Sequence, residues 1–264
     1  MKVCRLLFDG QARYGLVESR NEIDTVTGIF AKAALPGSMR DLRVEQKVSI
    51  ALKDATLLAS TEPSKILCVG RNYREHAAEL GNEVPAEPLI FLKPPSSLLN
   101  GGGTIVRPRL SRRVDYEGEL GVIMGKRCSK LREDEDVRPY ILGYTCVNDV
   151  TARDLQKKDS QWTRGKGFDT FCPVGPVISD EADPWNGVQV QTRVNGQLKQ
   201  DGNTLEFIFP LDRIIHYITQ VMTLLPGDLI ATGTPSGVGP VQAGDAVEVS
   251  VAGVGTLCNS VADE

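Results

Sequence analysis

Two glutamates lie two residues apart in the segment VDYEGELGVIMG, residues 114–125, at Glu117 and Glu119. Residues i and i+2 of a β-strand point to the same face. On a continuous strand the two carboxylates would therefore converge, and they would repel each other unless a cation lay between them. The alternative is a surface strand whose acidic side faces water, where such residues are common. Spacing alone leaves both interpretations open.

A third carboxylate favours the metal site. Asp149 follows Asn148 at the end of the apolar run 141–147, which predicts a strand, and the next residues, TARDLQ, begin a predicted helix or turn. A strand end beside a loop gives a site rigid support, although Asp149 could instead cap the next helix. Three oxygen ligands, completed by water and substrate, suit Mg²⁺, Mn²⁺ or Ca²⁺ better than zinc.

The chain has two histidines, so proton transfer by histidine has two candidates. His76 and Glu79 are three residues apart in RNYREHAAEL, a predicted helix with Asn72 as N-cap and Gly81 as its stop. A carboxylate beside an imidazole raises its basicity and fixes its tautomer, so the pair could take a proton from water. An exposed pair would be only a minor surface contact. His216 lies in the apolar helix predicted within LEFIFPLDRIIHYITQVMTL, where a structural role is expected.

One lysine and one loop complete the candidates. Gly165 and Gly167 flank Lys166, which would let a ligand approach the backbone and leave the ammonium accessible; the alternative is an ordinary solvated lysine. The loop ATGTPSGVG, residues 231–239, could offer backbone N–H groups and hydroxyls to a carboxylate. It lacks the spacing and the lysine of a nucleotide-binding P-loop, which excludes that function.

The composition is that of an ordinary globular protein: 264 residues, 41% hydrophobic and 24% charged. A net charge of −4 and scattered basic residues give no indication of nucleic-acid binding. No apolar run is long enough to cross a bilayer, and we expect the N-terminus to form the first strand of the fold and not a signal peptide. Six widely separated cysteines then indicate reduced thiols in a cytoplasmic protein.

The elements that must position these side chains are mostly strands. Residues 1–60 contain short apolar runs separated by glycine and polar breaks, and 61–65 resembles a linker. A strand is predicted over 66–70 and a loop over 81–88, while VNGQLKQDGN predicts a hairpin with an Asn-Gly turn. The sum is a strand-dominated α+β fold.

Six segments together resemble the fumarylacetoacetate hydrolase family. In chain order they are VGRNYREHAAEL, IFLKPPSSL, VDYEGELGVIMG, YTCVNDVTARDLQ, WTRGKGFDTFCPVGP and LLPGDLIATGTPSGVG. The resemblance covers roughly residues 66–240, and residues 1–60 match only as a variable N-terminal part. It implies a mixed β-sandwich roll, a small β-rich N-terminal domain over 1–60, a catalytic domain over 61–264, and a homodimer.

The resemblance also implies roles for individual residues. It places Mg²⁺ or Mn²⁺ on Glu117, Glu119 and Asp149. It implies that His76 and Glu79 form a catalytic dyad on a segment that closes over substrate. It implies that Lys166 is an active-site lysine. Three further residues would lie near substrate: Arg71, Gln156 and Thr234.

The implied activity is metal-dependent chemistry on a small 2-oxo acid or 1,3-diketo acid through a metal-bound enolate. The chain is short and looks more like the small acylpyruvase, oxaloacetate decarboxylase and isomerase members than the hydrolases of tyrosine breakdown. We expect hydrolysis of a C–C bond in acylpyruvates, decarboxylation of oxaloacetate, or both. The alternatives are an isomerase or decarboxylase of the 2-hydroxyhepta-2,4-diene-1,7-dioate type in aromatic catabolism, and a metal-stabilised binding protein without catalysis.

Overall fold

β-Strands dominate the structure, a computed structural model that describes residues 1–20, 23–31, 35–79 and 84–264. Within these residues the strands form three sheets. The largest contains β1 (Lys2–Phe8), β2 (Gln11–Arg20), β3 (Ile23–Phe30), β4 (Val44–Ala51), β5 (Ile66–Gly70), β6 (Leu89–Lys93), β7 (Leu98–Asn100), β10 (Gly118–Met124), β11 (Ile141–Asn148), β13 (Cys172–Ser179) and β16 (Leu229–Ala231). The four N-terminal strands and the strand over 66–70 confirm the sequence prediction.

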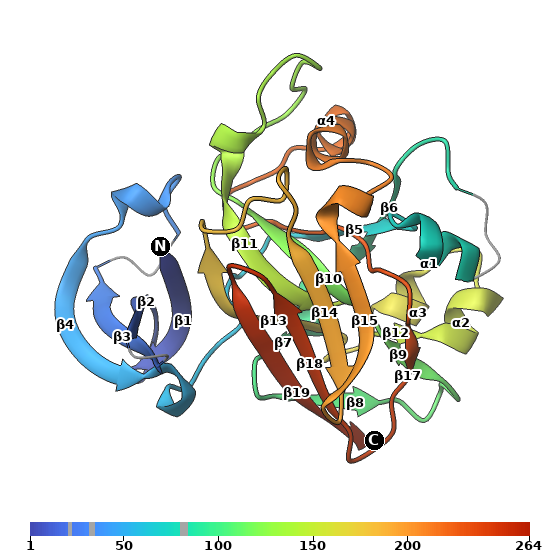
Figure 1. Cartoon of the computed structure of the whole chain (residues 1–264), viewed down its shortest axis with the longest axis horizontal. Coiled ribbons are helices and arrows are strands. Elements are labelled where there is room, and N and C mark those ends of the chain that lie inside the picture. Colours follow the sequence, from blue (N-terminus) through green and yellow to red (C-terminus); the bar gives the residue numbers. More distant parts are fainter. Residues whose placement is uncertain (21–22, 32–34, 80–83) are drawn as a thin grey trace.

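The order in the large sheet is β4-β3-β2-β1-β13-β11-β10-β16-β5-β6, with β7 pairing beside β13. The N-terminal strands β1–β4 lie to one side of the rest of the chain (Figure 1). They join it through a short antiparallel pairing of β1 with β13, where Val3 faces Ile178. The domain boundary at residue 60 stays a prediction.

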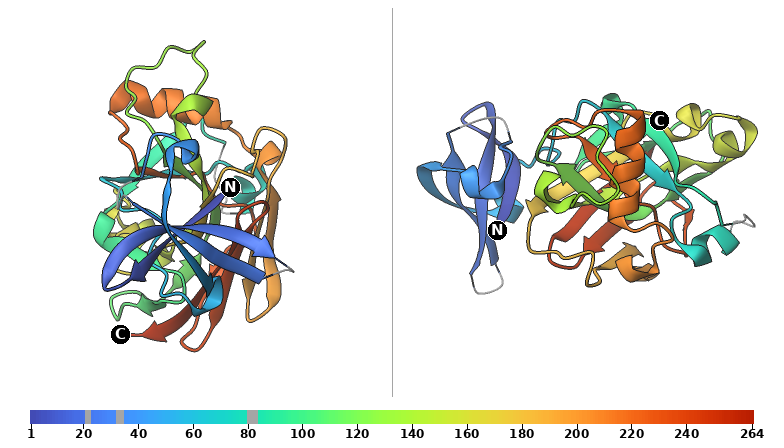
Figure 2. Two further views of the ribbon diagram at one scale, coloured as in Figure 1. Left: turned by 90° about the vertical axis from the view of Figure 1, so that its left-hand side faces the viewer. Right: turned by 90° about the horizontal axis from the view of Figure 1, so that it is seen from above.

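A second sheet covers one face of the large one. It has the order β15-β14-β18-β19-β8, from β8 (Thr104–Arg107), β14 (Gln189–Val194), β15 (Gln197–Asn203), β18 (Ala246–Val251) and β19 (Gly255–Asp263). Contacts of β14 and β18 with β10 and β11 bring the two sheets face to face (Figures 1 and 2). Buried aliphatic side chains fill the space between them, among them Leu120, Val190, Val249 and Leu257. This confirms the predicted sandwich.

The predicted hairpin turn is present between β14 and β15. Asn195 and Gly196 have φ of 51° and 75°, the left-handed values that a tight two-residue turn requires and that asparagine and glycine tolerate.

The helices are few and short. They are α1 (Arg74–Glu79), α2 (Arg153–Lys158), α3 (Thr163–Lys166) and α4 (Leu211–Val221). Helix α4 packs Ile214, Ile215 and Ile218 into the core, as the apolar spacing predicted. Helices α1, α2 and α3 gather on the opposite side of the molecule from β1–β4 (Figure 1).

The third sheet is small and lies at the ends of β10 and β11. It has the order β12-β9-β17, from β9 (Val114–Tyr116), β12 (Thr151–Ala152) and β17 (Gly239–Pro240). The chain passes from β9 to β10 at Glu117 and from β11 to β12 at Asp149, so both acids lie where a strand changes sheets. The expectation of one continuous strand over 114–125 was therefore wrong, because residue 117 is a break between strands of two sheets.

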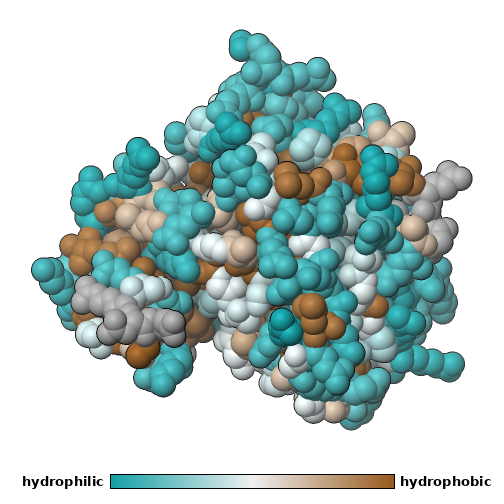
Figure 3. Space-filling view, in the orientation of Figure 1, coloured by the Kyte–Doolittle hydropathy of each residue, from teal (hydrophilic) through white to brown (hydrophobic). Residues whose placement is uncertain are grey.

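The surface in Figure 3 is largely hydrophilic with scattered apolar patches. None of the helices in the described part of the chain combines the length and the apolarity needed to span a bilayer. All six cysteines are free thiols, and five are buried, with Cys258 exposed.

Candidate metal and substrate site

The three predicted carboxylates come together despite the break at residue 117. One oxygen from each of Glu117, Glu119 and Asp149 can be chosen so that all lie within 4.8 Å of one another. The side chains are almost completely buried, with 4%, 2% and 1% of their residue surfaces exposed. The backbone joins the two sheet crossings directly, because the N–H of Asp149 donates to the carbonyl of Glu117 over 2.8 Å. A solvated acidic strand is thereby excluded.

Glu117 is bound by two cations. Lys166 Nζ lies 2.7 Å from its Oε2, and the Arg153 guanidinium donates to its Oε1 over 2.5 Å. Burial alone would raise the pKa of Glu117, but these two charges outweigh it and hold the pKa below its usual range. Glu117 is therefore a carboxylate whose charge is stabilised by protein groups alone.

Asp149 lies between two buried lysines. Its Oδ1 accepts from Lys93 Nζ over 2.6 Å and its Oδ2 from Lys166 Nζ over 2.6 Å. Helix α2 begins four residues later and draws no cap from Asp149, so the alternative of a helix cap was wrong. Lys93 also donates to the carbonyl of Val150 over 3.1 Å, which fixes the ammonium at this strand end.

Glu119 is different from its two neighbours. Its Oε2 accepts from the backbone N–H of Gly233 over 2.7 Å, and it forms no ion pair with any residue in the described ranges. Burial raises its pKa well above the usual value, and the charges of Asp149 and Glu117 raise it further. A buried carboxyl beside two other acids, with no described cation of its own, is suited to bind a divalent ion. The oxygen donors fit a hard cation such as Mg²⁺ or Mn²⁺.

Lys166 is buried rather than solvated, with 2% of its surface exposed. Burial opposes its charge, but Asp149 and Glu117 keep its pKa above the ordinary value. The flanking glycine Gly165 serves helix packing, since a Cβ there would lie 2.9 Å from the Cα of Gln156 in α2. Close approach of α3 to α2 thus carries Lys166 into the acidic cluster.

The predicted His76–Glu79 pair is present in α1. His76 Nδ1 lies 3.3 Å from Glu79 Oε2, and only 4% of the His76 surface is exposed, so this is not a surface contact. Burial lowers the pKa of His76, although Glu117 and Glu79 oppose that shift. The imidazole therefore stays neutral and able to accept a proton.

The loop over 231–239 donates to the protein's own carboxylates. Gly233 holds Glu119, and the N–H of Gly237 lies 3.1 Å from Glu79 Oε1. The loop thus orients one acid of the cluster and one acid of the dyad. Thr234 is equally engaged, because its hydroxyl donates to the carbonyl of Gly118 and accepts from Gln200.

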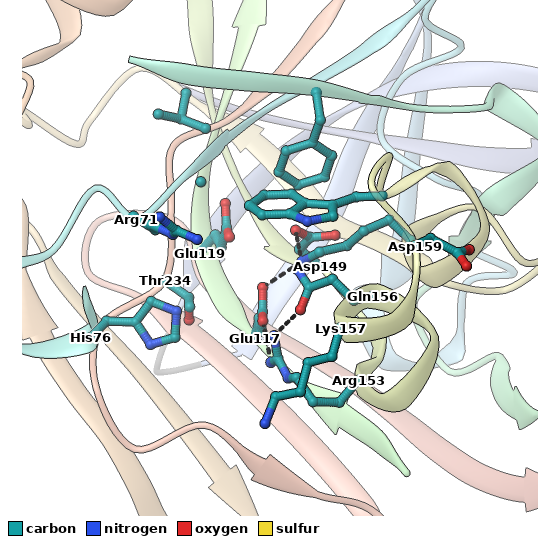
Figure 4. Close-up of a pocket in the computed structure, with 15 residues that line it drawn as sticks. Arg71, His76, Glu117, Glu119, Asp149, Arg153, Gln156, Lys157, Asp159 and Thr234 are labelled. Atoms are coloured by element: carbon teal, nitrogen blue, oxygen red, sulfur yellow. Dashed lines mark hydrogen bonds and ion pairs between the residues drawn. The ribbon is translucent and has the colours of Figure 1, made fainter. Parts of the chain in front are cut away.

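A cavity of about 320 Å³ joins these groups. Figure 4 shows His76, Arg71 and Thr234 on one side of the acids and the α2 side chains on the other. Every residue predicted for the site except Glu79 lines it, together with Val69, Gly70, Phe91, Arg153, Lys157, Asp159 and Trp162. Arg71 has a φ of 57°, a left-handed backbone that is uncommon outside glycine and often marks functional sites.

The predicted start of helix α1 was wrong. The helix begins at Arg74, and the Asn72 side chain instead accepts from the N–H of Phe209 over 2.8 Å and donates to the carbonyl of Thr232 over 2.8 Å. These buried bonds tie the α1 segment to the rest of the domain. The predicted helix stop, Gly81, lies outside the described residues; 84–88 forms no helix or strand, as expected for a loop.

Two buried cations were not singled out from the sequence. Lys93 ends β6 in the segment IFLKPP, and Arg153 lies four residues after Asp149. Arg153 bridges Asp115, Glu117 and Gln156. A lysine directly before two prolines, at the end of an apolar strand, was a usable signal, but nothing in the local pattern of Arg153 indicated burial.

Comparison with known proteins agrees with the fold. The family model described as fumarylacetoacetate (FAA) hydrolase, C-terminal, matches residues 65–262. A mitochondrial oxaloacetate decarboxylase from Dictyostelium discoideum is 46% identical over 73% of this chain and 90% of its own length.

Two solved structures resemble the whole chain or most of it. The 2-hydroxyhepta-2,4-diene-1,7-dioate isomerase from Mycobacterium marinum is 39% identical, with a TM-score of 0.89 over 100% of this chain and 99% of that one. The fumarylpyruvate hydrolase from Pseudomonas aeruginosa, solved with Mn²⁺ and pyruvate, is 28% identical, with a TM-score of 0.72 over 78% of this chain and 92% of that one. By its family match and its relatives, this chain belongs to the fumarylacetoacetate hydrolase family.

Proposed function

We propose that this protein is a divalent-metal-dependent hydrolase that cleaves a C–C bond in acylpyruvates, yielding pyruvate and a carboxylic acid. The observation that carries the proposal is the contact of Glu79 with His76, whose buried imidazole lines the cavity that also contains the acidic cluster. Isomerisation and decarboxylation need no attacking water, whereas hydrolysis does, and a neutral imidazole oriented by a carboxylate is suited to activate one.

Mg²⁺ or Mn²⁺ would be held by Glu117, Glu119 and Asp149. When bound, the ion would act as a Lewis acid on substrate oxygens. The uncompensated Glu119 supports this assignment, as does the Mn²⁺ and pyruvate found in the relative from Pseudomonas aeruginosa.

The remaining steps fall to side chains of the chain itself. Glu79 accepts the Nδ1 proton of His76, which leaves Nε2 as the base that takes a proton from water. The water oxygen attacks the carbonyl carbon of the acyl group, and the bond to the methylene carbon breaks. The electron pair of that bond remains on the pyruvate half, whose methylene carbon is then protonated.

Two cations would receive the substrate's negative charge. Lys166 donates two of its three N–H groups to Glu117 and Asp149, so one N–H group remains for a substrate oxygen. Arg71 lines the cavity and pairs with no described residue, so its guanidinium is available to the substrate carboxylate.

Oxaloacetate decarboxylation is the second candidate, favoured by the name of the Dictyostelium relative. The same groups would serve it, except that no water is activated. The likeness to the Mycobacterium marinum enzyme gives isomerisation of an unsaturated dioate as a further alternative.

A substrate panel tests the proposal. Protein stripped with a chelator and reloaded with Mg²⁺ or Mn²⁺ is given acetylpyruvate, fumarylpyruvate or oxaloacetate, and the products are followed by mass. We expect pyruvate from the acylpyruvates only with metal. His76→Asn should abolish that hydrolysis while sparing oxaloacetate decarboxylation. Full activity after chelation, or equal losses of both reactions in His76→Asn, would contradict the mechanism.

A further inference from the structure

A second cavity lies next to the site cavity. A cavity of about 250 Å³ is lined by Glu79, Arg113, Arg153, Lys157 and Val238. Two of these residues, Arg153 and Lys157, also line the cavity of the acidic cluster. The two cavities therefore meet at helix α2.

The dyad lies on the side of the site that faces the second cavity. His76 lines the first cavity and its partner Glu79 lines the second. A pyruvate half held at the acidic cluster, with its acyl carbonyl at His76, would direct the rest of the acyl arm past Glu79 into this second space. The inference below rests on the proposed function for that placement of the pyruvate half.

The charges around the two cavities are mostly neutralised within the protein. Asp115 binds both arginines, with Arg113 Nε at 2.8 Å and Arg153 Nε at 2.9 Å. Glu79 accepts from Gly237 and contacts His76. Asp159, the remaining acid beside α2, is bound by two nitrogens of Arg164 at 2.8 and 2.6 Å. No acid described in these linings thus pairs with Lys157.

Lys157 is left as the available cation at the junction. It is exposed, and it makes no hydrogen bond or ion pair with any residue in the described part of the chain. Arg71 is also without a described partner, but it lines only the first cavity. Figure 4 shows the Lys157 side chain extending from α2 beside Arg153. Val238 supplies an apolar contact for the carbons between the two ends of a ligand.

We propose that Lys157 binds a second carboxylate at the far end of the substrate's acyl arm. The protein would then favour keto acids with two terminal carboxylates over keto acids of the same length that end in a methyl group. A lysine contacts a carboxylate as a flexible point charge without fixed geometry, which suits arms of somewhat different length.

Binding measurements test this without turnover. The probes are 2-oxoadipate and 2-oxohexanoate, two six-carbon keto acids that differ in whether the far end is a carboxylate or a methyl group. Their affinities for the Mn²⁺-loaded protein are measured by calorimetry for wild type and for Lys157→Met, Lys157→Arg and Lys158→Met. Lys158 is the matched control, because it is the next residue of α2, is exposed, and lines neither cavity.

We expect wild type and Lys157→Arg to bind 2-oxoadipate more tightly. Lys157→Met should lose about five- to tenfold in affinity for 2-oxoadipate, the usual range for one partly exposed charged contact, and nothing for 2-oxohexanoate. Lys158→Met should change neither. Equal affinities in wild type, or equal effects of the two lysine substitutions, would overturn the inference.

The same variants separate this inference from the proposed function. If acylpyruvates are hydrolysed but Lys157→Met changes the affinities for 2-oxoadipate and 2-oxohexanoate equally, the role of Lys157 is overturned and the hydrolase stands. If Lys157→Met weakens only the binding of 2-oxoadipate but no acylpyruvate is hydrolysed, the hydrolase is overturned and the carboxylate site at Lys157 is supported.

Discussion

Neutralising Glu119 and neutralising Glu117 should change stability in opposite directions when no metal is present. The two residues are two positions apart, are both buried, and belong to the same acidic cluster. They differ in that Glu117 is bound by Lys166 and Arg153, whereas Glu119 has the N–H of Gly233 as its only partner among the described residues. The substitution to glutamine keeps the shape of the side chain and removes its charge.

The magnitude follows from the separation of the charges. Two unit charges at 4.8 Å, the upper bound on the separation of these oxygens, repel by about 3.5 kcal/mol at an effective dielectric constant of about 20. Glu119 has two such neighbours, whose charges are largely offset by Lys93, Lys166 and Arg153. We therefore expect Glu119→Gln to raise the free energy of unfolding by about 1–3 kcal/mol in the presence of a chelator.

Glu117→Gln should have the reverse effect. It leaves two buried cations with one carboxylate fewer, and removing one partner of a buried ion pair costs about 3 kcal/mol or more. The assay is urea unfolding at neutral pH followed by far-UV circular dichroism, with chelator or with Mn²⁺. Wild type should gain stability with Mn²⁺, by about 2.7 kcal/mol at a hundred times the dissociation constant, and both variants should lose most of this gain. Equal destabilisation of the two variants in chelator, or an undiminished Mn²⁺ response, would refute the reasoning.

Three further results are expected. Lys93→Met should destabilise the protein by about 3 kcal/mol in urea titrations, because it leaves Asp149 with one buried cation; a loss below about 1 kcal/mol would argue against a buried pair. The acid limb of kcat/KM should have its midpoint below pH 6.5, since burial lowers the pKa of His76. The same pKa shift contributes stability that is present above pH 6.5 and is lost as pH falls, because His76 is then protonated in the unfolded chain before it is protonated in the folded chain. A kinetic limb with its midpoint above pH 7 would exclude His76 as its source. Gly165→Ala should lower kcat strongly at a cost of about 1–3 kcal/mol in stability, since its Cβ would push α3 away from Gln156 and move Lys166; unchanged kinetics would contradict this packing role.

Much of the site was readable from residue types and spacing. Glu117, Glu119 and Asp149 do converge, and His76 does contact Glu79. The convergence has a different cause from the one inferred, however. A period of two along a single strand cannot reveal that the backbone leaves one sheet at residue 117, because that depends on pairing partners far away in the chain.

The buried cations show the same limit. Arg153 looks like an ordinary polar residue in the sequence, and the place of Lys93 at the end of an apolar strand does not name its partner. Only the tertiary structure surrounds these cations with Asp149, Asp115 and Glu117. Asn72 was misread for a related reason. Its local position suits a helix cap, but bonds to Phe209 and Thr232, more than a hundred residues away, satisfy the side chain instead. Long-range pairing decided each of these cases.

The two sheet crossings at Glu117 and Asp149 have an evolutionary consequence. Each acid is fixed by the strands of two sheets, so neither can be repositioned without disturbing both. Lys157, by contrast, projects from a six-residue helix at the surface, where substitutions cost little stability. The acids at the sheet crossings therefore resist change, whereas α2 tolerates substitutions. New substrate preferences can arise on α2 while the acidic cluster keeps its shape.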